Sequence, residues 1–68
     1  MPVYAWVEGQ TVVDVLLACG LAGTKNEARR LVEQKGVRLD GELLAQPQAL
    51  FPHYGILQVG KRRFVQVI

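Results

Sequence analysis

Apolar residues recur at helical spacing directly after Thr11. They lie on one face of a predicted helix and are Val12, Val13, Leu16 and Leu17. The Thr11 hydroxyl can cap a free backbone amide, and Asp14 places a negative charge where the helix dipole favours it. Gly20 is a natural left-handed stop, after which Leu21 can fold back on the last turn. The pattern therefore predicts a short, mostly buried helix.

A second helical pattern follows after a short connection. Thr24 and Glu27 have the spacing of a capping box, in which each side chain accepts a hydrogen bond from the other residue's backbone amide. The inward-facing residues of this helix are predicted to be Ala28, Leu31 and Val32. Gly36 is the predicted end of the helix. Because so few residues connect the two helices, we expect them to pack as a pair.

The second half of the chain predicts two hairpins. Residues 37–44 contain Asp40 and Gly41, which tolerate the positive φ angles of a type I′ turn. Residues 56–68 are rich in β-branched residues on both sides of Gly60. The stretch between the hairpins is punctuated by prolines and predicts no regular element.

These elements define an α+β fold, in which two short packed helices precede a small antiparallel sheet of hairpins. The 68 residues suffice for one domain. Residues 1–10 show only a loose apolar alternation, and we expect them to be an extended lead-in or linker to a domain of residues 11–68.

No apolar run approaches the roughly 20 residues of a membrane span. Residues 1–10 lack the charged start and apolar stretch of a signal peptide, so we expect none. The single cysteine excludes an internal disulfide, which fits a reducing cytosol. From these features together we expect a cytoplasmic protein without a membrane partner.

Charge distribution is more informative than the net charge of +2. All eight basic residues fall in two stretches, and these eight are the candidate RNA-binding residues: Lys25, Arg29, Arg30, Lys35, Arg38, Lys61, Arg62 and Arg63. Only Glu27 and Glu33 are interspersed with them. A fold that brings the two stretches together would create one strongly positive face.

The basic residues of the second helix have two interpretations. Lys25 and Arg29 share one flank, four residues apart, whereas Arg30 lies farther toward solvent. An anionic partner would offset the repulsion between like charges at that spacing. In the structural interpretation the helix face is simply solvated, with Arg29 paired to Glu33 and Arg30 to Glu27. The sequence leaves both interpretations open.

The consecutive cations 61–63 favour an anionic partner more strongly. They are expected at a tight turn with no acid near them in sequence. Protection of an edge strand against aggregation is the alternative, but a single lysine would satisfy it. Three adjacent cations favour contact with phosphate groups. Arginine outnumbers lysine five to three in the chain, and its planar fork suits phosphate recognition.

Enzyme chemistry has little support in the sequence. One histidine, His53, and one cysteine, Cys19, cannot form a zinc cage, and Cys19 is interpreted as a small core residue. We therefore expect no catalytic residue, metal or cofactor. The aromatic residues are scattered, and Phe64 alternates with strand residues as a core side chain would. This pattern is not that of a platform that stacks successive bases, and it favours recognition of a folded RNA by shape and backbone.

Residues 20–42 resemble the alpha-L RNA-binding motif, which is named after the fourth protein of the small ribosomal subunit. The resemblance rests on the capped start of the second helix, the run Glu-Ala-Arg-Arg-Leu at 27–31 and the Asp-Gly turn at 40–41. Residues 56–67 resemble the final hairpin of bacterial tyrosyl-tRNA synthetases, which have this domain at their C-terminus. The first helix is similar too, so the resemblance covers residues 11–68.

This resemblance implies a domain that holds transfer RNA around its long variable arm and the anticodon stem, with catalysis in another part of the synthetase chain. It places Lys25, Arg29 and Arg30 at RNA-facing helix positions and residues 61–63 in the basic hairpin. One departure is that Gln10 and Thr11, at the start of the first helix, are uncharged where many family members have a basic residue. The RNA footprint is therefore expected nearer the second helix and the final hairpin.

Two other functions remain open. The same module could bind ribosomal RNA in a ribosome-associated or RNA-modifying protein. Alternatively, its basic face could meet an acidic protein partner. That last interpretation requires an exposed apolar patch, for which Trp6 and Phe51 are the candidates.

Overall fold

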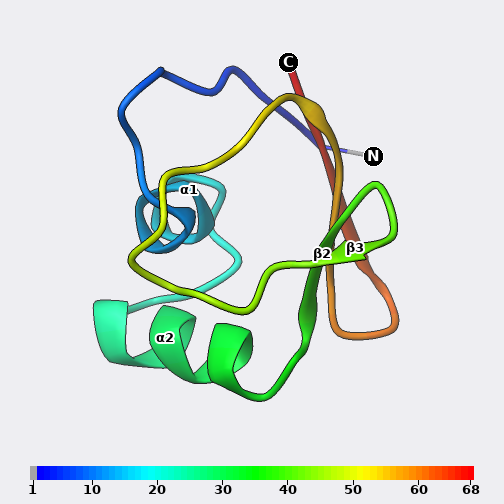
Figure 1. Cartoon of the computed structure of the whole chain (residues 1–68). Helices are drawn as coiled ribbons and strands as arrows, with labels where there is room; N and C mark the ends of the chain where they lie inside the picture. The colour runs from blue at the N-terminus through cyan, green and yellow to red at the C-terminus, as the bar shows by residue number, and fades with distance from the viewer. Residues whose placement is uncertain (1) are drawn as a thin grey trace.

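Two helices pack against one face of a sheet in the computed structural model, which describes residues 2–68 (Figure 1). The described elements are, in chain order, β1 (Val3–Tyr4), α1 (Val12–Ala18), α2 (Lys25–Glu33), β2 (Val37–Leu39), β3 (Glu42–Leu43), β4 (Gly55–Val59) and β5 (Arg63–Val67). The five strands are ordered β1-β5-β4-β2-β3 across the sheet. The predicted α+β class, with paired helices ahead of two hairpins, is confirmed.

The start and the end of α1 follow the predicted chemistry. The Thr11 hydroxyl accepts from the Asp14 backbone N–H at 3.2 Å, and the Asp14 carboxylate accepts from the Thr11 N–H at 3.0 Å. This reciprocal pair satisfies two of the amides that a helix start leaves free. At the other end, Gly20 has a φ of 75°, and the Leu21 N–H reaches back to the Leu16 carbonyl at 3.0 Å.

The capping box predicted for α2 forms only in part. The Thr24 hydroxyl accepts from the Glu27 N–H at 3.1 Å, as expected. The Glu27 carboxylate, however, accepts from the N–H of Gly23 at 3.2 Å and not from that of Thr24. Glu27 is therefore committed to the chain that enters the helix, one residue farther back than the motif predicts.

The left-handed residue that follows α2 lies one position before the predicted glycine. Lys35, not Gly36, adopts the left-handed conformation, with a φ of 61°. The Gly36 N–H then bonds to the Leu31 carbonyl at 3.0 Å and the Lys35 N–H to that of Val32, also at 3.0 Å, which closes a Schellman-type cap. A lysine thus occupies a backbone position that glycine usually takes.

The first hairpin turns at Asp40 and Gly41, whose φ angles of 50° and 85° confirm the predicted type I′ turn. Asp40 does more than turn the chain. Its carboxylate accepts from the Ile56 N–H at 2.9 Å, and its own N–H bonds to the Ile56 carbonyl at 2.9 Å. The turn is therefore fastened to the start of β4, which fixes β2 beside β4.

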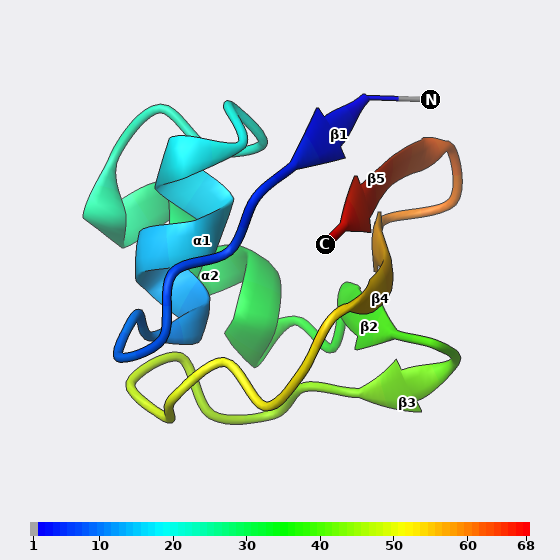
Figure 2. The ribbon, with the colours of Figure 1, turned by 90° about the horizontal axis from the view of Figure 1, so that it is seen from above.

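The N-terminal segment contributes a strand that the sequence did not predict. In β1, Val3 pairs with Gln66 and Tyr4 with Val67, parallel to β5. Trp6 extends the contact with a hydrogen bond from its N–H to the Ile68 carbonyl at 3.0 Å. The two ends of the described chain lie side by side in Figure 2. The sheet is therefore mixed, and the prediction of a purely antiparallel sheet is wrong at this edge.

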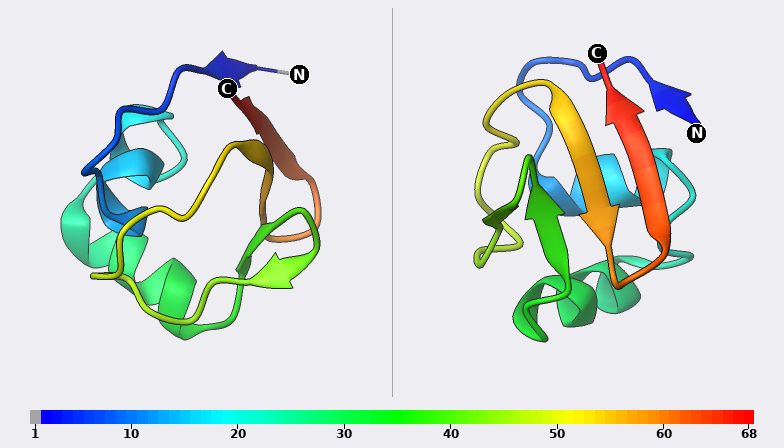
Figure 3. Two further views of the ribbon diagram at one scale, coloured as in Figure 1. Left: turned by 45° about the horizontal axis from the view of Figure 1, so that its top comes forward. Right: turned by 90° about the vertical axis from the view of Figure 1, so that its right-hand side faces the viewer.

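The hydrophobic core lies between the helices and the inner face of the sheet. Nine of its largest side chains are fully buried: Leu16, Leu39, Leu57, Val12, Val15, Val32, Val37, Val65 and Val67. Val15 is missing from the predicted stripe of α1, whereas Leu17 and Leu31, which were predicted to face inward, are only half-buried. The right-hand view of Figure 3 shows the strands in front and both helices behind them. No helix within residues 2–68 covers the outer face of the sheet.

Three aromatic residues differ from expectation. Phe64 is 39% exposed on the outer face, so its interpretation as a core residue is wrong. Phe51 is buried and lies against the half-buried Trp6, with ring centroids 5.8 Å apart. These two rings therefore do not form the exposed apolar patch that a protein-interaction module would require.

Candidate nucleic-acid interface

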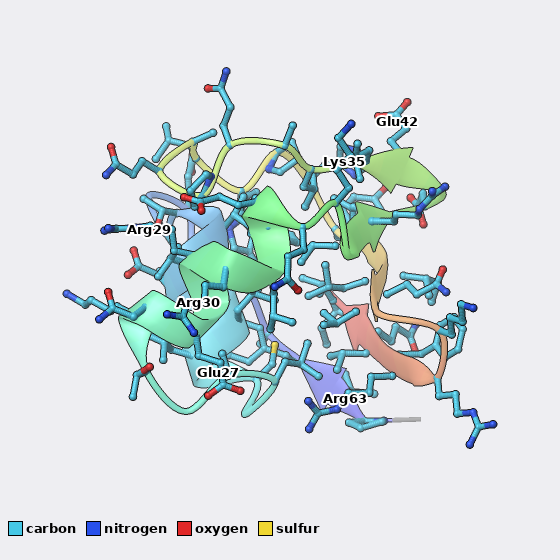
Figure 4. All side chains as sticks on the ribbon, turned by 90° about the horizontal axis from the view of Figure 1, so that it is seen from below. Glu27, Arg29, Arg30, Lys35, Glu42 and Arg63 are labelled. Carbon is cyan, nitrogen blue, oxygen red and sulfur yellow. The ribbon has the colours of Figure 1, made fainter. Side chains whose placement is uncertain are left out.

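All eight basic side chains are exposed. They project from α2, from the connection between α2 and β2, from β2, and from the β4–β5 hairpin. The view from below shows the labelled side chains of α2, Lys35 and Arg63 together with the β4–β5 hairpin (Figure 4). What matters for function is where the two basic stretches of the sequence meet.

One flank of α2 faces the start of α1. Lys25 and Arg29 line a shallow pocket of about 180 Å³ together with Thr11 and Asp14. The hydrogen bonds from the backbone N–H and the hydroxyl of Thr11 lower the pKa of the Asp14 carboxyl, and the charge of Lys25 acts in the same direction. Asp14 is thus already held by the helix cap. The two cations beside it are open to solvent.

The ion pairs of the solvated-helix interpretation are not formed. Among residues 2–68 the structure records no ion pair between a carboxylate and a lysine or arginine. Glu27, the expected partner of Arg30, accepts instead from the backbone of Gly23. Arg29 and Arg30 are exposed, so their guanidinium groups are available to an anion from outside the chain.

A second basic site lies where α2 leads into the sheet. We call it the basic pocket; its volume is about 440 Å³, and it is lined by Lys35, Gly36, Arg38, Gln58, Gly60 and Lys61. Its three cations come from three different segments, and no carboxylate is among the lining residues. A hydrogen bond of 2.7 Å from the Gly60 N–H to the Gly36 carbonyl ties the two loops together. The fold therefore brings the two basic stretches of the sequence into one site.

The last cation of the hairpin has a structural bond as well. The Arg63 guanidinium donates through Nη1 to the Leu21 carbonyl at 3.1 Å, joining β5 to the connection between the helices. Arg62, its neighbour in the turn, is exposed, and no such bond is recorded for it within the described chain. The two arginines cannot be told apart by sequence, because the partner of Arg63 lies far away along the chain.

The sequence analysis missed Gln58 as part of this surface. Gln58 lies opposite Arg38 in the β2–β4 pairing, and its amide donates through Nε2 to the Gly60 carbonyl at 3.0 Å. The available signal was the alternation along β4, in which Leu57 and Val59 face inward and Gln58 therefore faces outward. That signal identifies a face but not the cations that meet there.

Elsewhere the described chain offers little reactive chemistry. Within residues 2–68 no three histidine, cysteine, aspartate or glutamate side chains lie close enough to hold a metal ion. Burial raises the pKa of the Cys19 thiol, which lowers its thiolate fraction and its reactivity. Nδ1 of His53 lies 2.6 Å from the Tyr54 carbonyl oxygen. None of the helices in this part of the chain has the length and apolar character to cross a membrane.

The two-helix, small-sheet fold with an exposed basic helix beside a basic hairpin defines a small module of the alpha-L RNA-binding type. Residues 10–48 match the S4 domain, and the chain belongs to the S4 domain family.

Similarity to curated proteins extends over most of the chain. It is 40% identical over 63 residues to a tyrosine–tRNA ligase of Xanthomonas euvesicatoria, which covers 90% of this chain and 16% of the relative. Identity is 39% over 69 residues with the tyrosine–tRNA ligase of Thermotoga maritima, covering 98% of this chain and 17% of the relative. For tyrosine–tRNA ligase 1 of Vibrio vulnificus, identity is 43% over 61 residues, or 82% and 14% of the two chains. The chain thus spans only about a sixth of the length of these relatives.

Proposed function

We propose that this chain binds transfer RNA as the C-terminal module of a tyrosyl-tRNA synthetase. The observation that carries the proposal is the basic pocket, in which cations from both basic stretches converge on the RNA-binding fold. Similarity to tyrosine–tRNA ligases over 90% of the chain supports the choice of RNA. Activation of tyrosine would then belong to parts of the synthetase outside this chain, and the module would work in the cytoplasm.

The eight cations would act chiefly on the RNA backbone. Lys25, Arg29 and Arg30 would follow one stretch of phosphates along α2, and the basic pocket would hold another. Exposed arginines can bind phosphate through two parallel N–H groups, which positions the RNA without reading its sequence. Such contacts suit a folded RNA recognised by its shape, as expected for a long variable arm beside an anticodon stem. Arg63 would contribute to the interface while also bracing the hairpin that presents it.

Two alternatives differ in their partners. A ribosomal-RNA-binding module would use the same cations, so only the choice of RNA separates it from the synthetase proposal. A protein-interaction module is less well supported, because Phe51 is buried and Trp6 packs against it. Both alternatives predict no preference for a transfer RNA with a long variable arm.

The deciding experiment is a titration of the 68-residue chain with a transfer RNA that has a long variable arm and with a matched one that lacks it. The synthetase proposal predicts tighter binding to the long arm. It also predicts that log K falls by about 0.7–0.9 per phosphate contact for each decade of salt. Equal binding to both RNAs would point to a general binder of structured RNA. No binding to either RNA at low salt would refute an RNA-binding function.

Single substitutions on α2 test the interface directly. Arg29→Ala and Arg30→Ala should each weaken RNA binding and reduce the salt dependence by roughly one phosphate contact. Neither arginine has a recorded ion pair within the described chain, so the unfolding temperature should change little. Glu33→Gln on the same helix is the matched control, because removing a negative charge there should strengthen binding. Unfolding of either alanine variant at a much lower temperature would reveal a structural role instead.

A further inference from the structure

The outer face of the sheet presents a row of side chains that α1 and α2 do not cover. Arg38 of β2 pairs with Gln58 of β4, and Gln58 pairs with Phe64 of β5. Directly paired residues in adjacent strands project from the same face with Cβ atoms about 4.5–5.5 Å apart. An arginine, an amide and an aromatic ring therefore lie in one line across three strands. We call this line the outer row.

The outer row is continuous with the basic pocket. Arg38 and Gln58 belong to both, and the pocket adds Lys35 and Lys61 at the end of the same strands. Gln58 lies between Arg38 and Phe64. At the usual spacing of strands, Phe64 is therefore roughly 10 Å from Arg38. One surface thus combines three cations, a hydrogen-bonding amide and an exposed aromatic ring.

We propose that the outer row binds one unpaired nucleotide of the RNA, with its phosphate in the basic pocket and its base stacked on Phe64. The inference rests on the proposed RNA-binding function and extends it beyond α2 to the uncovered face of the sheet. It assigns a binding role to Phe64 and Gln58, two residues that recognition of the RNA backbone alone would not involve.

The chemistry of the row matches the parts of a nucleotide. A phosphate suits Lys35, Arg38 and Lys61, because no carboxylate lines the pocket to neutralise them. A base offers a flat face to the Phe64 ring, which is 39% exposed. Gln58 donates one N–H to the Gly60 carbonyl and presents an amide that can meet the polar edge of a base beside Phe64. One ring supports one base, so the row would hold a single looped-out nucleotide and not a run of stacked bases.

The test compares three RNA ligands on the intact 68-residue chain: hexaadenylate, an abasic hexamer with the same number of phosphates, and a blunt-ended RNA duplex. Hexaadenylate should shift the backbone amide NMR signals of Arg38, Gln58 and Phe64. The abasic hexamer should bind about tenfold more weakly, because it lacks the stacking base. Phe64→Leu should weaken hexaadenylate binding by about tenfold and leave duplex binding unchanged.

Matched variants separate stacking from folding. Phe64→Tyr keeps a ring at the same position and should retain hexaadenylate binding. Tyr54→Leu removes an aromatic ring that is 71% exposed but lies outside the outer row, and it should have no effect. All three variants change exposed side chains, so their unfolding temperatures should stay close to that of the wild type.

Three outcomes would overturn the inference: equal binding of hexaadenylate by Phe64→Leu and the wild type, equal binding of the abasic hexamer and hexaadenylate, or amide shifts confined to α2. In each of these cases, salt-dependent binding to transfer RNA would leave the proposed function standing. Failure of the chain to bind any RNA would remove both. The two proposals therefore fail in distinguishable ways.

Discussion

Replacing Lys35 with glycine should stabilise the domain while lowering its affinity for RNA. Lys35 closes α2 with a φ of 61°, a conformation that costs a non-glycine residue about 1–2 kcal/mol. Glycine avoids that cost but loses more conformational freedom on folding, by about 0.5–1 kcal/mol. The expected net gain is about 1 kcal/mol. For a domain of this size, that corresponds to a rise in Tm of about 4–8 °C. The same change removes one of the three cations of the basic pocket.

The control is Lys35→Ala, which removes the same cation but keeps a Cβ in the left-handed position. Thermal unfolding followed by circular dichroism should give a higher Tm for the glycine variant than for both the alanine variant and the wild type. RNA titrations should show both variants weakened to the same extent, with a salt slope lower by about 0.7–0.9. If the glycine variant were no more stable than the alanine variant, backbone strain at Lys35 would be refuted.

Three further predictions follow from single contacts. Arg63→Ala should lower the free energy of unfolding by about 1 kcal/mol and should also lower the affinity for RNA. Arg62→Ala should lower the affinity for RNA alone. Denaturant unfolding and RNA titration of both variants distinguish the two effects. Gly55→Ala should destabilise the domain by more than about 1 kcal/mol, because its φ is 150° and a Cβ there would lie 2.7 Å from Cγ of Asp40. If urea unfolding gave this variant the same free energy of unfolding as the wild type, the close approach of Gly55 to the Asp40 side chain would be contradicted. The carboxyl of Asp14 has a lowered pKa, so its contribution to stability is complete above the unfolded value of about 3.9 and is lost as the pH falls through the lower folded value. Asp14→Asn should therefore lose less stability than the wild type when unfolding is measured in steps below about pH 4.

Local chemistry made much of the fold predictable. The stop of α1 at Gly20 and the turn at Asp40 and Gly41 depend on residues adjacent in sequence, and each formed as expected. The left-handed position after α2 was misplaced by one residue, because Gly36 is intrinsically the better left-handed residue; the structure has that conformation at Lys35, and the Gly36 carbonyl accepts from the Gly60 N–H. The pairing of β1 with β5 could not be predicted, since the loose apolar alternation of residues 1–10 indicates an extended segment but does not specify a partner strand.

The candidate site was predictable in its residue types but not in its arrangement. Alternation along β5 offers two faces, one with Arg63, Val65 and Val67 and the other with Phe64. Phe64 was assigned to the core because it alternates with strand residues, but Val65 and Val67 face inward, and Arg63 on the same side donates to the Leu21 carbonyl. Phe64 is consequently exposed. Which loops meet at the basic pocket depends on long-range pairing, which residue spacing does not reveal.

The pairing of β1 with β5 also bears on how the domain forms during protein synthesis. Helices α1 and α2 contact each other through neighbouring sequence, so they can associate early. Val3 of β1, by contrast, pairs with Gln66 of β5, which lies almost the whole length of the chain away. A growing chain can complete that edge of the sheet only after β5 has left the ribosome. Until then the nascent sheet lacks β5, and β1 has no strand to pair with, so the domain acquires its full structure only after β5 has been made.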